Sequence, residues 1–136
     1  MTEETRTLVR YRLDRVKEAL EEAALLLASG YANTFVNRLY YACFYAVSAL
    51  LLAQGLSSAR HSGVRALLHQ RIIKPGLLRI SQGQTYDKFF DNRQKGDYAD
   101  LVRFAVQDVQ PWLDEAQAFV DDVEVLILKE IDRPNS

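Results

Sequence analysis

Apolar residues recur at steps of three and four along much of the chain, which is the spacing of amphipathic helices. In residues 5–29 they are separated by charged side chains, and Gly30 follows as a plausible stop. Residues 33–54, opened by Asn33 or Thr34, are apolar on nearly every side and end at a second glycine. This pattern predicts two long helices, of which the second is the central helix of a bundle.

The second half of the chain predicts three shorter helices. The apolar pattern of residues 64–73 indicates a third helix, and residues 80–85 are expected to form a loop. A short fourth helix follows and is expected to break at Gly96. The last helix is expected to be capped by Asp108, with Pro111 in its first turn, where the missing N–H costs little.

These elements define the expected fold class. No segment alternates with the period of a strand, and 136 residues with 49% apolar content suffice for one compact core. We therefore expect a single all-α domain over residues 1–136, an antiparallel up-and-down helical bundle of about five helices. Apolar surface left over would suit the interface of a homodimer.

Composition excludes several classes of protein. The single cysteine, Cys43, allows no disulfide, so a reducing, cytoplasmic setting is expected. The longest apolar-rich run, residues 39–53, is about 15 residues and too short for a bilayer, so no membrane partner is expected. The two histidines that share a helix face, His61 and His69, have no carboxylate or thiol on that face, so neither a metal site nor a cofactor is expected.

Charge is distributed unevenly along the chain. Residues 60–103 hold nine basic and four acidic side chains, whereas residues 104–136 hold two basic and eight acidic ones. The basic segment is either a local anion-binding face or an ordinary solvated surface.

Polar side chains interrupt the apolar pattern at two places. Asn37, Arg38 and Tyr41 lie within the central helix, where polar groups need partners, and Arg38 requires an acidic neighbour or a water-filled cleft. The second place is residues 91–98, at the end of the fourth helix. The two segments together suggest either one site between two helices or a structural network.

Four segments in the same order and spacing resemble the HEPN family, in particular its small single-domain prokaryotic members. They are residues 30–32, 37–46, 61–64 and 93–98. The resemblance implies a helical bundle that dimerises so that two copies of an arginine-containing motif face one cleft. It also implies a minimal nucleotidyltransferase as partner in a toxin-antitoxin pair, and metal-independent RNA cleavage in the ribonuclease members.

The chain departs from the family motif, in which a histidine follows the arginine after four to six residues. Tyr98 stands at the first of these positions after Arg93, and no histidine occupies any of them. Arg93 can stabilise charge on a phosphate, Tyr98 can donate a proton, and Asp97 can accept one. The resemblance also places Tyr98 nearest the tyrosine that a partner nucleotidyltransferase modifies with AMP.

Two hypotheses follow. In the first, the chain handles nucleotides or RNA, with or without nuclease turnover. Its catalytic candidates are then Arg93, Tyr98 and Asp97, and its nucleotide- or RNA-binding candidates are Asn37, Arg38, Tyr41, Lys95 and His61. In the second, the chain is a non-catalytic interaction and dimerisation module, and the same residues fasten the bundle.

Overall fold

The computed structural model describes residues 1–98 and 102–134, and for Tyr98 the backbone only. All regular structure in these residues is helical: α1 (Glu3–Ala28), α2 (Ala32–Ala53), α3 (His61–Leu68), the π-helical turn η1 (His69–Ile73), α4 (Ile80–Tyr98), α5 (Val106–Val109) and α6 (Trp112–Ile131). The predicted all-α helical bundle is confirmed. The single turn α5 is an addition to the five helices expected.

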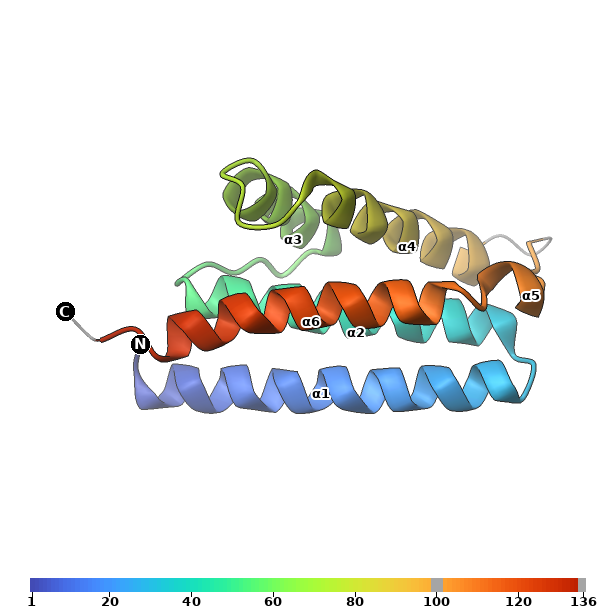
Figure 1. Cartoon of the computed structure of the whole chain (residues 1–136), viewed down its shortest axis with the longest axis horizontal. Helices are drawn as coiled ribbons and strands as arrows, with labels where there is room; N and C mark the ends of the chain where they lie inside the picture. Colours follow the sequence, from blue (N-terminus) through green and yellow to red (C-terminus); the bar gives the residue numbers. More distant parts are fainter. Residues whose placement is uncertain (99–101, 135–136) are drawn as a thin grey trace.

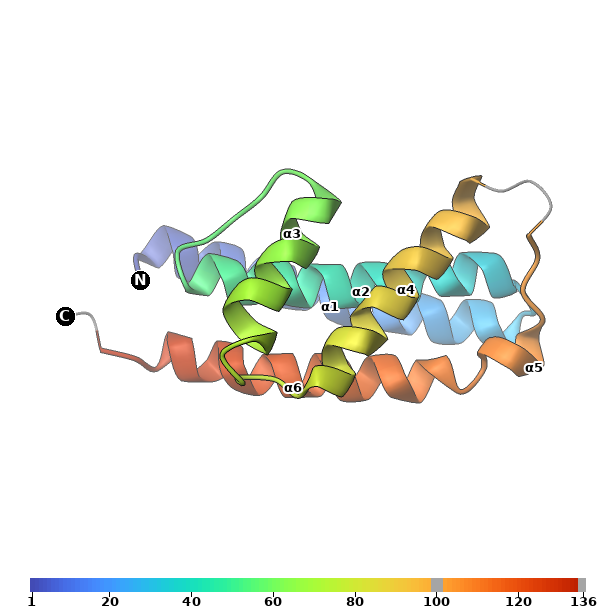
Figure 2. The same cartoon turned by 90° about the horizontal axis from the view of Figure 1, so that it is seen from above.

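The helices form three layers (Figure 1). The long helices α1, α2 and α6 run along the length of the molecule, and α3 and α4 lie across α2 on the side away from α1. The two termini lie at the same end. Seen from above, α3 and α4 diverge like the arms of a V, farthest apart where α3 begins and α4 ends (Figure 2).

Helix α2 is the centre of the core, as its sequence predicts. Thirteen of its 22 residues are buried, and it packs against α1, α3, α4, α5 and α6. It is long and apolar enough, by length and composition alone, to cross a membrane. However, 67% of its most apolar window is buried inside the structure, which is the situation of a core helix.

The ends of the first two helices follow from local sequence. The Thr2 hydroxyl accepts a hydrogen bond from the Thr5 amide at 3.1 Å and caps α1. Gly30 follows α1 and Gly55 follows α2, with φ of 84° and 78°, a backbone conformation that favours glycine. Both predicted stops are confirmed.

Asn33 does not open α2, which begins one residue earlier. Its side chain instead holds the segment between α4 and α5. The Asn33 amide nitrogen donates to the Val102 carbonyl at 3.0 Å, and its oxygen accepts from the Phe104 amide at 2.9 Å. Two backbone groups of an irregular segment thereby gain partners.

The expectation of a loop at residues 80–85 was wrong, because α4 already begins at Ile80. Gln82 and Gly83 in this first part of α4 are buried against neighbouring helices. Gln82 donates to Asp122 of α6 at 2.6 Å, and a Cβ at position 83 would lie 2.9 Å from the His69 ring. Gly83 therefore serves close packing of α4 on η1.

Three further boundaries differ from expectation. Gly96 does not break α4; it allows the Phe104 ring to approach within 3.0 Å of where a Cβ would be. Asp108 lies inside α5 and does not cap the last helix, and Pro111 directly precedes α6 without entering its first turn. The third helix ends as an α-helix at Leu68 and continues as η1.

Candidate functional site

Arg93 is a charged residue in the core, with only 6% of its surface exposed. Its guanidinium lies over two aromatic rings of α2, 4.7 Å from the centre of Tyr40 and 5.8 Å from that of Tyr41. Its Nε is buried without a hydrogen-bond partner among the described residues. Among the described residues its ion-pair partner is Asp97, whose carboxylate is 3.7 Å from Nη1 and so beyond hydrogen-bond length.

A chain of polar side chains holds Asp97 in place. Asn37 donates from Nδ2 to both Asp97 carboxylate oxygens, at 3.2 and 2.9 Å. The Asn37 oxygen accepts from Nε and Nη2 of Arg38, at 3.2 and 3.0 Å. Arg38 in turn faces the Glu22 carboxylate of α1 at 3.9 Å, which supplies the acidic partner expected for it. Asp97 therefore keeps its position without help from Arg93.

His61 reaches the same region from α3, of which it is the first residue. Its Nδ1 lies 2.6 Å from the hydroxyl oxygen of the fully buried Tyr40. Its ring stacks on Phe44, with centroids 4.3 Å apart and planes 16° from parallel. The edge of Tyr41 closes a further side at 5.8 Å. The imidazole is thus held in one orientation by the aromatic side chains of α2.

The environment shifts the pKa values of two of these groups. Burial, and secondarily the charge of Arg93, lowers the pKa of His61 below its ordinary value. Burial raises the pKa of Tyr40 to about 12, against the opposing effects of the Tyr86 hydroxyl and, less, of the charge of Arg93. At neutral pH the imidazole is therefore neutral and the phenol keeps its proton.

Seven side chains from α2, α3 and α4 meet in this way. We call them the Arg93 cluster: Asn37, Arg38, Tyr40, Tyr41, His61, Arg93 and Asp97. The cluster joins the start of α3 and the last turns of α4 to α2.

Six of the eight residues singled out from the sequence belong to the cluster. Lys95 is exposed on α4 and takes no part in the contacts of the cluster. The side chain of Tyr98 lies outside the described residues. Tyr40 was missed by sequence reasoning. Its signal is its spacing from Asn37 and Phe44, since steps of three and four put all three on one side of a helix.

The second histidine lies outside the Arg93 cluster. His69 of η1 has its Nε2 3.0 Å from a carboxylate oxygen of Asp87 on α4. The sequence offers no carboxylate on the helix face of the histidines, and the partner of His69 comes instead from α4. His69 has a local structural partner.

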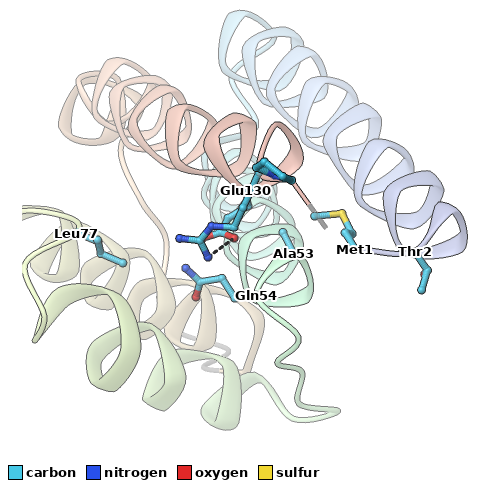
Figure 3. Close-up of a pocket in the computed structure, with 8 residues that line it drawn as sticks. Met1, Thr2, Ala53, Gln54, Leu77 and Glu130 are labelled. Atoms are coloured by element: carbon cyan, nitrogen blue, oxygen red, sulfur yellow. Dashed lines mark ion pairs between the residues drawn. The ribbon is translucent and has the colours of Figure 1, made fainter. Parts of the chain in front are cut away.

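A cavity of about 880 Å³ opens at the other end of the bundle, near the two termini. Figure 3 shows Gln54, Leu77 and Glu130 around it. Its acid, Glu130, is paired with Arg133 at 3.6 Å, and no histidine lines it. The Arg93 cluster, by contrast, combines a nearly buried guanidinium, whose Nε has no described partner, with a histidine, so the cluster is the stronger candidate site.

Comparisons with known proteins find relatives over most of the chain. The HEPN domain family model matches residues 9–126, a range that includes the whole cluster. A UPF0332 protein of Thermotoga maritima is 42% identical over 124 residues, covering 91% of this chain and 94% of its own length. Two proteins of Methanocaldococcus jannaschii, named "Putative toxin MJ0605" and "Putative toxin MJ0142", are 27% and 24% identical, and the matches cover 96% and 85% of this chain and 96% and 79% of theirs.

Proposed function

The chain belongs to the HEPN domain family, and we propose that it is a toxin that binds RNA at the Arg93 cluster and cleaves it without a metal. The names of two relatives support a toxin role. Family membership supports a homodimer in which two Arg93 clusters face one cleft. It also supports a cytoplasmic partner of the minimal nucleotidyltransferase kind, with Tyr98 as the residue that this partner modifies.

One observation carries the RNA-binding proposal: the guanidinium of Arg93 is nearly buried, yet its Nε has no hydrogen-bond partner among the described residues. The Nε of Arg93 has no described partner, and its ion pair with Asp97 is long. Leaving such donors unpaired costs about 1–3 kcal/mol. A phosphate oxygen would give the Nη side of the guanidinium a closer partner than Asp97 at 3.7 Å, and the rings of Tyr40 and Tyr41 already orient the guanidinium plane.

The chemistry of RNA cleavage requires a cation of this kind. Negative charge builds up on the phosphate oxygens as the 2′-oxygen attacks, and a preorganised donor in a dry site stabilises it strongly. The carboxylate of Asp97 would repel the phosphate. This repulsion is weakened because Asn37 donates a hydrogen bond to both carboxylate oxygens.

The alternative is a non-catalytic interaction module. The chain of contacts from Glu22 through Arg38 and Asn37 to Asp97 joins α1, α2 and α4, as a structural network would. Under this reading Arg93 only fastens α4 to α2, and RNA is neither bound nor cut.

Cleavage of a mixed RNA pool in EDTA separates the two readings. The variants are Arg93→Met, Tyr98→Phe and a matched control, Lys88→Met, which removes a cation from the same helix. Lys88 pairs with Glu115 at 2.6 Å and lies over Trp112, outside the Arg93 cluster. We expect cleavage by wild type and Lys88→Met that is lost in Arg93→Met. An intact pool at high wild-type concentration would exclude the ribonuclease.

A further inference from the structure

The family motif places its histidine just after the arginine on the same segment, and this chain has none there. The structure brings a histidine to Arg93 from a different helix. His61 of α3 and Arg93 of α4 contact the same ring, that of Tyr40 on α2. The two residues are 32 positions apart in the chain, so no linear motif would pair them.

We propose that His61 is the general base of the Arg93 cluster, taking the proton of a ribose 2′-hydroxyl while Arg93 binds the adjacent phosphate. This inference rests on the proposed ribonuclease function and deepens it. It restricts the substrate to RNA, because DNA offers no 2′-hydroxyl to deprotonate.

The contacts of His61 suit a base that acts through Nε2. Nδ1 faces Tyr40 at 2.6 Å, whereas no described residue bonds to Nε2. The donor and the acceptor of this bond depend on the tautomer; the base role requires the proton on Nδ1, so that the imidazole donates to the phenol oxygen of Tyr40 and the Nε2 lone pair is free. The same hydrogen bond stabilises the imidazolium once Nε2 has taken a proton, which is how an orienting partner assists a catalytic histidine. Stacking on Phe44 fixes the ring plane.

Burial and, secondarily, the charge of Arg93 keep His61 neutral at neutral pH, so that it is able to accept a proton. The groups that face it or flank it are Tyr40 and Tyr41 on α2, Arg93 on α4 with its partner Asp97, and Arg60 and Arg65 at and within α3. Burial and the charge of Arg93 lower the pKa of His61. The base form consequently persists to lower pH than for an ordinary histidine.

The reaction balances without any further reagent except water. Nε2 of His61 takes the 2′-hydroxyl proton, and the 2′-oxygen forms a bond to phosphorus. The bond between phosphorus and the 5′-oxygen breaks, and that oxygen takes a proton from water. His61 returns its proton to solvent. The products are a 2′,3′-cyclic phosphate and a 5′-hydroxyl, with no change of oxidation state.

The test is the pH dependence of metal-free cleavage of a short RNA, compared with the same sequence carrying a single 2′-O-methyl group at the cut. His61→Gln is compared with His69→Gln, the other histidine of the chain. We expect kcat to fall about 10²- to 10⁴-fold in His61→Gln, with KM nearly unchanged and the acidic limb of the profile lost. His69→Gln should keep the wild-type kcat and the acidic limb of the pH profile. The methylated RNA should stay intact.

Two variants guard against a merely structural effect. Tyr40→Phe keeps the ring that supports Arg93 and removes only the hydroxyl, and should lower kcat about tenfold, the worth of one hydrogen bond. His61→Ala should regain activity with added imidazole. Circular dichroism confirms that each variant is folded.

The outcomes separate the two proposals. If wild type cuts RNA and His61→Gln cuts it equally well with the same pH profile, the role of His61 is overturned and the proposed function stands. If wild type leaves RNA intact, the proposed function falls, and the role of His61 falls with it. The NMR titration of His61 gives a readout besides activity: its pKa should rise in Arg93→Met, and an unchanged pKa would overturn the coupling of the two residues.

Discussion

Replacing Arg93 with methionine should remove activity while leaving the stability of the fold almost unchanged. Methionine is unbranched, fills a space of similar length, and packs well against the aromatic rings of Tyr40 and Tyr41. Substitution of a structural residue lowers the free energy of unfolding, whereas substitution of a ligand-binding residue lowers activity and often leaves the free energy of unfolding unchanged.

Two contributions of opposite sign determine how Arg93→Met changes the free energy of unfolding. Loss of the cation–π contact at 4.7 Å costs about 2 kcal/mol for a desolvated guanidinium. Removal of the buried, unpartnered Nε returns about 1–3 kcal/mol. Asp97 is not stranded by the change, because its side chain is 27% exposed and held by Asn37. The two effects nearly cancel, so the free energy of unfolding should stay within about 1 kcal/mol of wild type.

Urea unfolding followed by circular dichroism, at one protein concentration, measures this difference. With a slope of about 2 kcal/mol per molar urea, the expected change shifts the midpoint by no more than about 0.5 M. Lys88→Met should cost about 1 kcal/mol, since Lys88 is partly exposed and its cation–π contact and ion pair are ordinary. A loss of about 3–5 kcal/mol in Arg93→Met, the usual result of breaking a structural buried pair, would refute the reasoning.

Three further changes test other parts of the structure. Asn33→Ala removes two hydrogen bonds to the segment between α4 and α5 and should lower stability by about 2 kcal/mol in urea unfolding. Gly63→Ala would put a Cβ 2.9 Å from that of Ser58, beside the start of α3, and should lower both the melting temperature and RNA cleavage; unchanged melting would contradict the tight packing seen there. Cys43 is fully buried and burial raises its pKa, so its thiol should not react with a disulfide reagent until urea unfolds the protein, and fast reaction of the native protein would contradict this burial.

The fold was predictable where apolar spacing is regular. Residues 33–54 are apolar nearly all round, and all but the last of them lie in the central helix α2 (Ala32–Ala53). Prediction failed where polar or glycine residues are buried by neighbours far along the chain. Residues 80–85 look like a loop, yet Gln82 bonds to Asp122, and Gly83 and Gly96 serve close packing instead of ending helices. A glycine in the sequence therefore does not by itself show whether a helix ends there or whether a neighbouring side chain packs closely against the backbone.

The site was predictable only in its parts. A polar residue in an apolar helix signals a partner, and this signal found Asn37 and Arg38. It does not reveal which distant residue the partner is. The meeting of His61 with Tyr40 depends on the crossing of α3 over α2, and that geometry is not encoded in any local pattern.

The most direct test of the central claim is whether Arg93 contacts an RNA phosphate. Binding of a labelled single-stranded RNA that carries 2′-O-methyl groups, and so cannot be cut, is measured by fluorescence anisotropy over a range of salt concentrations. We expect Arg93→Met to weaken binding at least about tenfold and to lower the slope of log affinity against log salt by about 0.7, the effect of one phosphate contact. Equal affinity and equal slope for Arg93→Met, Lys88→Met and wild type would contradict the claim.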